Sequence, residues 1–520
     1  MKYKMPPKGI KICIGIVSLI LFILVLVIAI NAGNNEVETI KIVSDDVQDF
    51  IPGNVTGNCV ETGDNDKNRE EDNLSDKNQE TKSGKNKRPK GISDNIRVLI
   101  SDKSHGYVQP YVELSCNTEY TVNDGKELVI HRKDDIITID SETLKEGTVI
   151  IAPNSEEGRI TISSIIKSGG APSYRGTIEI AACDEGYTVV NSLPVEEYLY
   201  GVVASEVPAT FEEEALKTQA VCARGFAYNR ICNPAFLEYG ADLDDSTSSQ
   251  VYNNFPETDS SIDAVNDTYG IVPMYNNDFI TALYFSTSCG VTCSNADVWG
   301  GEALDYLGEY YQKEQDDEVY LADETAFRSF IDDNMINKQK CIDMYEAELP
   351  FYRWTAVYSY EEMTNAIANG IVTCDADKVF VLKNGKYVAM GEECPDIGEV
   401  TSIRVEQRGT SGIVKELIVV GSNNTVKCVG QHNIRRLLRP FDITITCRDG
   451  SEKTGYEMLP SAFFYVQRDE GIGQFMIKGG GFGHGSGMSQ NGANEMAKLG
   501  YNYKEIINHY YRNVELVQIK

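Results

Sequence analysis

Nine short β-type runs separated by turn residues occupy the chain between residues 96 and 191. β-Branched and aromatic residues are frequent in each run, and Gly, Asp, Asn, Ser or Pro residues stand between the runs. The runs are IRVLI, YVELS, EYTV, ELVIH, IITID, TVIIA, RITIS, TIEIAA and YTVVN. Because the intervals between them are short, the pattern predicts an antiparallel β region.

Further strand-like runs follow in the second half of the chain. A β-containing block spans 280–295, and SIRVEQ, ELIVVG, FDITIT and FFYVQ lie between 401 and 477. The block 302–400 is harder to assign, because helical patterns (ETAFRSFIDDN, YEEMTNAIANG) stand beside the strand-like PFYRWTAVYS. No tandem repeat is visible in the sequence.

Two short helices are predicted near the C-terminus. One covers about 489–499 and ends at Gly500, and the other covers about 503–511 after an Asn502/Glu505 capping box. Together these patterns predict an α+β fold over 94–520, a strand-dominated body with a few helices.

The N-terminus predicts a membrane anchor. Lys2, Lys4, Lys8 and Lys11 precede an uncharged apolar run over 12–30, which is long enough to cross a bilayer as a helix. The Ile30-Asn31-Ala32 sequence is a poor cleavage site, so we expect an uncleaved transmembrane helix with residues 1–11 in the cytoplasm. Residues 31–93 are polar and acidic and predict a disordered stalk, which holds the rest of the chain outside the cytoplasm.

Composition excludes one class of partner. The chain has 520 residues, 42% of them hydrophobic, and a formal net charge of -30. Such a polyanion repels phosphate backbones, so nucleic acid is not an expected partner. The 13 cysteines have no repeated spacing. Cys289 and Cys293 of the CGVTC element are close enough in sequence to pair or to share a metal. Two sulfurs do not make a zinc site, so buried thiols with a few disulfide bridges are the favoured interpretation.

Glu206 is the candidate catalytic residue. It follows apolar residues at 202–204 and precedes Val207 and Pro208, in what we interpret as an apolar loop just before a helix. Desolvation there would raise its carboxyl pKa and allow it to donate a proton near neutral pH. A buried structural Glu that accepts bonds from backbone N–H groups is the alternative.

A helix is predicted directly after Glu206, which indicates that Glu206 lies in an ordered segment. Thr210 and Glu213 have the spacing of a capping box, and an apolar face recurs at Leu216, Ala220, Ala223, Ala227 and Ile231. Glu206 would then lie about one turn before a helix N-terminus. The helix dipole would lower its pKa while burial raises it, and the sequence leaves that balance open.

A glycine-rich element forms a second constellation. GGGFGHGSGMSQNGA, residues 479–493, holds seven glycines around His484. Glycine at this density permits positive φ angles and close approach of the backbone to a ligand. No Lys stands at the position that a P-loop requires, so the sequence does not favour a phosphate-binding loop. We instead predict a loop that brings His484, Ser489 and Gln490 towards a polar ligand. A tight turn with a structural His is the alternative.

Three motifs in order carry a family resemblance. ASEVP with EEALKTQAVCARGFAYNR, YFSTSCGVTCSNADVWGG, and GGGFGHGSGMSQNGANEMAKLGYNYKEIINHYY together resemble the SpoIID/LytB family, over about 96–520. The resemblance implies a lytic transglycosylase, which cleaves the β-1,4 bond between N-acetylmuramic acid and N-acetylglucosamine and leaves a 1,6-anhydro ring. It places the catalytic acid/base at Glu206, with Val207 where methionine is usual.

The same resemblance suggests the residues that bind the glycan. We predict that hydrogen bonds to the sugars come from Gln219, Arg224, Ser286, Thr287, Ser288, His484 and Gln490. Each of these side chains could instead be structural, and Gln219 and Arg224 could tie their helix to the sheet. Some family members hold zinc in the segment that here reads EYGADLDDSTSSQVY, but this segment has no His or Cys, so we expect neither a metal nor another cofactor. Phe285 stands where the family often has His.

The resemblance also implies the biological setting. The expected substrate is peptidoglycan glycan strands denuded of stem peptides, with remodelling of the sporulation septum and engulfment as the process. A cell-wall amidase and sporulation membrane proteins are the expected partners, and the membrane is contacted through the N-terminal helix. A non-catalytic activator or scaffold of an amidase is the alternative. A hydrolase that uses Glu206 with a second acid is a third possibility.

Overall fold

The computed structural model describes residues 93–519 except 315–317, 337–343 and 392. The predicted cytoplasmic segment 1–11, the membrane helix 12–30 and the stalk up to residue 92 therefore lie outside the described residues. Within the described ranges, no helix combines the length and the apolar character needed to cross a bilayer.

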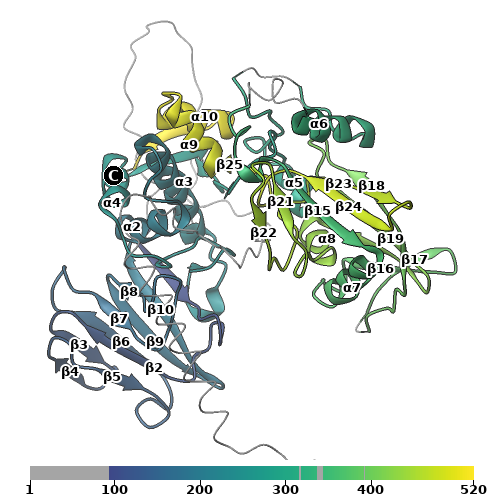
Figure 1. Cartoon of the computed structure of the whole chain (residues 1–520). Helices are drawn as coiled ribbons and strands as arrows, with labels where there is room; N and C mark the ends of the chain where they lie inside the picture. Colours follow the sequence, from purple (N-terminus) through teal and green to yellow (C-terminus); the bar gives the residue numbers. More distant parts are fainter. Residues whose placement is uncertain (1–92, 315–317, 337–343, 392, 520) are drawn as a thin grey trace, which may run out of the picture. The chain divides into compact units, whose positions relative to one another are not determined.

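Two antiparallel sheets form the first part of the described chain (Figure 1). The larger has the order β11-β1-β10-β9-β6-β3-β4, and only its β1–β11 pair is parallel. The smaller has the order β5-β2-β7-β8. The bounds are β1 Asn95–Ile100, β2 Val112–Cys116, β3 Tyr120–Asn123, β4 Leu128–His131, β5 Ile137–Ile139, β6 Thr148–Pro153, β7 Ile160–Ile162, β8 Ser173–Tyr174, β9 Thr177–Cys183, β10 Gly186–Pro194 and β11 Leu243–Asp244. Each of the nine predicted runs overlaps one of these strands, so the antiparallel prediction is confirmed.

Alternation of side chains explains why these runs pair. In β6, Val149 and Ile151 are buried while Ile150 is exposed, and in β9 Ile178 and Ile180 are buried in the same core. Successive side chains of a strand point to opposite faces, so one face of each strand is removed from water.

Helices and a small sheet follow β10 (Figure 1). α3 packs against α2, α4, α9 and α10. The elements are α2 Val195–Glu206, α3 Glu213–Cys232, the short 3-10 helix Leu237–Tyr239, α4 Asp259–Asp267, β12 Ile271–Tyr275, β13 Asp278–Phe279, β14 Tyr284–Phe285, α5 Asn295–Trp299, β25 Met488–Ser489, α9 Gln490–Lys498, α10 Tyr503–Tyr510 and β26 Glu515–Gln518. β13, β12 and β26 form a three-stranded sheet, and β14 pairs in parallel with β25.

Two helix predictions can be compared with α3 and α10. The predicted apolar face of α3 is buried at Leu216, Ala220, Ala223 and Ala227. Its predicted Thr210/Glu213 box is wrong, because the N-cap is Glu212 and makes no side-chain capping bond. The Asn502/Glu505 box of α10 is confirmed, with both reciprocal bonds formed.

Glu206 does not lie in a loop. It is the last residue of α2, an α-helix that we did not predict. We predicted that burial raises the Glu206 pKa while a helix dipole lowers it, and this prediction is therefore wrong as well. A helix C-terminus carries partial negative charge, so the dipole of α2 disfavours the ionised carboxylate, as burial does.

Two five-stranded sheets form most of the chain from 354 to 479 (Figure 1). Their orders are β22-β21-β15-β24-β23 and β17-β16-β20-β19-β18, and they share a core with α7 and α8. The bounds are α6 Glu324–Ile336, the 3-10 helix Pro350–Tyr352, β15 Trp354–Ser359, α7 Tyr360–Ile371, β16 Val379–Lys383, β17 Lys386–Ala389, β18 Val400–Arg408, β19 Val414–Gly421, β20 Thr425–Val429, α8 Gln431–Leu437, β21 Ile445–Cys447, β22 Glu452–Lys453, β23 Phe464–Asp469 and β24 Gln474–Gly479. The helical and strand-like patterns noted within 302–400 are confirmed as α6, α7 and β15, whereas only the end of FDITIT is strand.

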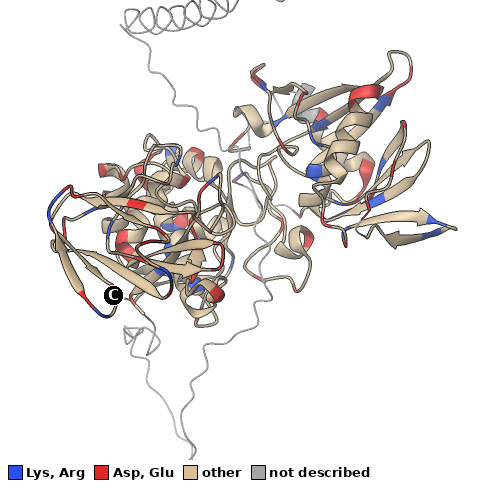
Figure 2. Ribbon diagram, turned by 90° about the horizontal axis from the view of Figure 1, so that it is seen from below, with Lys and Arg blue, Asp and Glu red and all other residues tan. Residues whose placement is uncertain are grey.

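Charged side chains are interspersed over these elements. Figure 2 shows Asp and Glu beside Lys and Arg on strands, helices and turns. Several form cross-strand or interhelical pairs, such as Arg97 with Glu179 at 2.6 Å between nitrogen and oxygen. In the part of the chain that the structure describes, the acidic excess is thus spread over many elements.

Candidate active site

Three donors converge on the Glu206 carboxylate from segments far apart in the sequence. Oε1 accepts a hydrogen bond from the Val251 N–H at 2.7 Å and another from the Tyr284 hydroxyl at 3.2 Å. Oε2 accepts only a long bond from the Gln490 side-chain amide, at 3.4 Å. Oε1 is therefore anchored, and Oε2 is the oxygen better able to carry a proton.

The surroundings of Glu206 favour its neutral form. The residue is half-buried, and burial of the carboxyl raises its pKa to about 7 from an ordinary value of 4.5. The bonds from Val251, Tyr284 and Gln490 lower the pKa but do not offset the burial. A carboxyl with a pKa near 7 is populated in both protonation states at neutral pH, as a residue that acts as acid and then as base requires.

Tyr284 belongs to a buried chain of hydrogen bonds that we did not predict. Its hydroxyl accepts from the Gln250 amide at 3.0 Å, and the Tyr198 hydroxyl of α2 donates to Gln250 at 3.1 Å. Burial, followed by the Glu206 charge, raises the Tyr284 pKa well above 10, so its hydroxyl stays protonated as a donor. Tyr284 directly precedes Phe285 in the YFSTSC motif, and its position there was the available signal.

Gln490 contacts both Glu206 and Gln219. The Gln490 amide is 3.5 Å from the Gln219 side-chain oxygen and 3.4 Å from the Glu206 backbone oxygen. The Gln219 side-chain nitrogen is buried and has no hydrogen-bond partner in the described part of the chain. A buried unpaired donor is costly, and because only 1% of Gln219 is exposed, a ligand would reach this nitrogen only if neighbouring side chains moved.

His484 positions Tyr284 rather than touching Glu206. Its Nδ1 accepts a bond from the Ser486 N–H at 3.2 Å, which leaves Nε2 to donate to the Tyr284 carbonyl at 3.0 Å. The ring also packs at 4.9 Å from Trp299 and 5.5 Å from Phe285, measured between ring centroids. The alternative of a structural His fits these contacts better than a direct sugar contact.

Ser286 and Thr287 interact with the start of α9. The Asn491 amide donates to the Ser286 carbonyl at 3.0 Å and to the Thr287 hydroxyl at 3.1 Å. Ser286 is half-buried and Thr287 is buried. These contacts place the STS element beside the residue that follows Gln490.

Arg224 and Ser288 are engaged within the protein, which corrects their predicted role. Arg224 is fully buried, bonds Glu196 with two nitrogens at 2.8 and 3.1 Å, and donates to the backbone oxygens of Val265 and Ile271. It thus ties α3 to α2 and to the α4–β12 segment. The Ser288 N–H and hydroxyl both bond Glu346, so neither is available to a sugar.

The glycine-rich element packs closely against a neighbouring segment of the chain. Gly481, Gly483, Gly485 and Gly487 all have positive φ, between 81° and 109°. A Cβ at Gly487 would lie 2.1 Å from the Leu283 carbonyl oxygen. Glycine is therefore required here so that this element can pack against the segment that carries Tyr284.

The described residues offer no cluster of side chains for a metal ion. They contain no group of three or more His, Cys, Asp or Glu side chains arranged to hold a metal. Ten cysteines in the described ranges are free thiols, with Cys289 and Cys293 buried. In the EYGADLDDSTSSQVY segment, Asp244 accepts from the Tyr107 hydroxyl at 2.9 Å.

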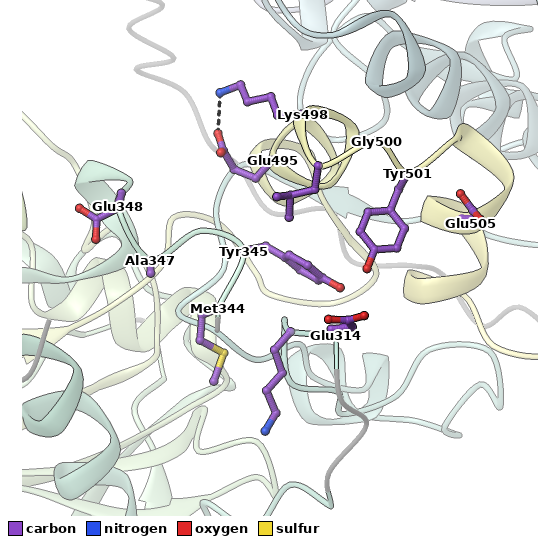
Figure 3. A pocket seen from close by; sticks show the side chains of 12 residues that line it. Glu314, Met344, Tyr345, Ala347, Glu348, Glu495, Lys498, Gly500, Tyr501 and Glu505 are labelled. Carbon is purple, nitrogen blue, oxygen red and sulfur yellow. Dashed lines mark hydrogen bonds and ion pairs between the residues drawn. The ribbon is translucent and has the colours of Figure 1, made fainter. Parts of the chain in front are cut away.

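A cavity of about 910 Å³ lies apart from the Glu206 group (Figure 3). Tyr345 and Tyr501 contact one another edge to face in its lining, with ring centroids 6.1 Å apart, and Glu314 lies beside them. Glu495 pairs with Lys498 at 2.7 Å among the lining residues. The residues that line it include none of the predicted site residues.

Fold and site together define a class of protein: an α+β protein with one half-buried carboxylate at the junction of a helix end, the YFSTS strand and a glycine-rich loop. Comparison with known proteins agrees with this class. The SpoIID family model, described as Stage II sporulation protein, matches residues 183–275, which include Glu206. A domain of unknown function, DUF8618, matches 293–487.

Relatives with curated names extend the match. Stage II sporulation protein D of Bacillus subtilis is 26% identical over 69% of this chain and 85% of its own length. The Amidase enhancer of the same organism is 27% identical over 61% of this chain but only 40% of its own length. An uncharacterized protein of Brachyspira hyodysenteriae is 28% identical over 66% of this chain and 72% of its own. These matches confirm the predicted resemblance to the SpoIID/LytB family.

Proposed function

We propose that this protein is a membrane-anchored lytic transglycosylase that cleaves the MurNAc-β-1,4-GlcNAc bond of peptidoglycan glycan strands during sporulation. The observation that carries the proposal is the Glu206 carboxyl, which is anchored through Oε1 and has a pKa of about 7. The relatives named for sporulation and for amidase enhancement support a role at the cell wall.

The chemistry follows from the two oxygens of Glu206. Protonated on Oε2, the carboxyl gives its proton to the glycosidic oxygen as the bond to C1 breaks. The resulting carboxylate then takes the proton of the muramoyl 6-hydroxyl as that oxygen closes on C1 to form the 1,6-anhydro ring. One carboxyl thus serves both proton transfers.

A hydrolase would need a second carboxylate beside the substrate. Glu346 is the other acid whose pKa burial raises to about 7, but it is 0% exposed and its oxygens accept bonds from Ser288 and Ser489. Glu346 therefore does not supply that second carboxylate.

Product mass tests the proposal. Purified full-length protein in detergent is incubated with glycan strands stripped of stem peptides, and the products are analysed by mass spectrometry. We expect anhydro products, lighter by one water than hydrolysis products, and at least a hundredfold less product from Glu206→Gln. Glu213→Gln is the matched control, since this α3 side chain is 72% exposed. Water-added products would overturn the transglycosylase assignment in favour of a hydrolase.

The second candidate is a non-catalytic activator of a cell-wall amidase, favoured by the Amidase enhancer relative. If the protein and its Glu206→Gln variant release no glycan fragments but both accelerate an added amidase on intact peptidoglycan, this second function replaces the first.

A further inference from the structure

Glu346 is a buried acid that the proposed chemistry does not use. Its residue is 0% exposed, and it lies within the DUF8618 match rather than the SpoIID match. Its neighbours Tyr345 and Ala347 line the cavity of Figure 3, whereas its own carboxylate faces the interior.

The carboxylate of Glu346 joins two segments that are separated by 200 residues. Oε1 accepts from the Ser288 N–H at 2.9 Å and from the Ser489 hydroxyl at 2.6 Å, while Oε2 accepts from the Ser288 hydroxyl. Ser489 is also the N-cap of α9, where its side chain accepts from the Gly492 N–H. One side chain thus fixes the end of the STS element and the start of α9.

Both segments carry donors to Glu206. Tyr284 lies four residues before Ser288, and Gln490 directly follows Ser489. The strands that contain these residues pair for only two positions, Tyr284 with Met488 and Phe285 with Ser489. Asn491 also joins these segments, because its backbone N–H and its side-chain amide both donate to the Ser286 carbonyl. Glu346 adds bonds at Ser288 and Ser489, and we expect these bonds to contribute to where the Tyr284 hydroxyl and the Gln490 amide lie.

Burying a carboxylate here is costly unless it is fully bonded, and Glu346 has no ion-pair partner among its contacts in the described ranges. Burial raises its pKa to about 7. An apolar residue would fill the same space without that cost but could not bond Ser288 and Ser489. Retaining an acid at this point is therefore consistent with a need to hold the two segments together.

We propose that Glu346 is a positioning residue through which the DUF8618 region holds Tyr284 and Gln490 against Glu206. The proposal rests on the proposed function of Glu206 and extends it, because it makes the active site a joint product of both regions of the chain.

Hydrogen–deuterium exchange of the full-length protein tests the positioning directly. In Glu346→Ala we expect faster exchange in peptides that cover 283–290 and 486–493. Glu346→Gln should exchange at close to the wild-type rate, because its amide oxygen can still accept from Ser288 and Ser489 while its NH₂ group donates to a rotated hydroxyl. Glu324→Ala breaks the ion pair of α6 with Arg408 in the same region and serves as the control, with no change expected in either peptide.

Activity gives the second readout. In Glu346→Ala we expect kcat to fall about ten- to a hundredfold with little change in KM, since displaced donors no longer orient the acid. The bonds from Tyr284 and Gln490 lower the Glu206 pKa in the wild type, so their loss raises it. The alkaline limb of the pH–rate profile of Glu346→Ala should therefore move to higher pH. Glu346→Gln should restore both values.

Opposing results are distinguishable. Unchanged exchange in both peptides of Glu346→Ala, or equal loosening in Glu324→Ala, overturns the positioning role. If exchange becomes faster only in Glu346→Ala and the wild-type protein releases no glycan product, the positioning role is supported and the proposed function is rejected. If Glu346→Ala does not fold, Ser288→Ala removes one hydroxyl donor and keeps the N–H bond. Exchange in the same two peptides should be faster than in the wild type, but by less than in Glu346→Ala. If both peptides of Ser288→Ala exchange at the wild-type rate, the proposal is overturned.

Discussion

Gln490, the first residue of α9, donates its side-chain amide to Glu206, the last residue of α2, across 284 positions of sequence. The bond is 3.4 Å long and reaches Oε2, which accepts no other described bond. The end of the chain thus supplies the group that faces the candidate proton donor.

Changing Gln490 should change the acidity of Glu206 in a graded way. Gln490→Ala removes a bond that lowers the Glu206 pKa, and Gln490→Glu places a like charge beside Oε2. We expect the alkaline limb of kcat/KM to move to higher pH in the order wild type, Gln490→Ala, Gln490→Glu. Lys498→Ala, on the 48% exposed side chain at the other end of α9, is the control. An unchanged limb in both Gln490 variants would contradict the contact.

Tyr284→Phe should act through the anchored oxygen. It removes one of the two donors to Oε1 and leaves the Gln250 amide without its 3.0 Å acceptor. We expect kcat to fall about tenfold, equivalent to about 1.4 kcal/mol, with KM little changed. Tyr275→Phe is the matched control, because its hydroxyl bonds Asp305 at the surface. A change confined to KM would show that Tyr284 binds glycan rather than orienting Glu206.

The strands of the first two sheets could be predicted from the sequence, but their order in the sheets could not. Each predicted β run formed a strand because period-two alternation depends on local residues alone. α2 was missed although Val195, Tyr198, Leu199, Val202 and Val203 recur with helical spacing. Its β-branched valines and Gly201 lower helix propensity, and packing against α3 and α4 overrides that preference.

Some contacts of the candidate site could be predicted from sequence motifs, and others could not. Gln490 and Gln219 could be named as neighbours of Glu206 because they lie within motifs of the family resemblance, and Gln490 contacts both Glu206 and Gln219. Ser288 lies in the same motif as Thr287, yet its partner is Glu346, a residue in the block 302–400 to which the sequence assigned no functional motif. The partner of a buried polar group is set by tertiary contacts, so no local spacing could have separated Ser288 from Thr287.

Arg224 should prove structural. Arg224→Met leaves the buried carboxylate of Glu196 without its partner, which should cost about 3–5 kcal/mol of unfolding free energy. The double variant Glu196→Gln/Arg224→Met removes that isolated charge and should recover part of the loss. Urea unfolding measures both effects, and KM for glycan per folded molecule should stay at the wild-type value. A raised KM with unchanged stability would return Arg224 to the substrate-binding set.

The pH dependence of stability offers a test of Glu206 that requires no substrate. Its folded-state pKa of about 7 exceeds the ordinary value of 4.5, so the folded protein retains a proton that the unfolded chain releases between these two pH values. The free energy of unfolding therefore falls as pH rises through this window, by about 1.4 kcal/mol per pH unit from this group. Glu206→Gln lacks that dependence.

We thus expect Glu206→Gln to gain stability relative to wild type as the pH rises from 4.5 to 8, by up to about 3 kcal/mol. The measurement is denaturant unfolding of both proteins at several pH values, and the difference between them cancels the contribution of Glu346, which both retain. Glu213→Gln, at an exposed site, should differ from wild type by a nearly constant amount. If the Glu206→Gln difference is equally flat, the carboxyl titrates like an ordinary exposed acid and is not poised to donate a proton near neutral pH.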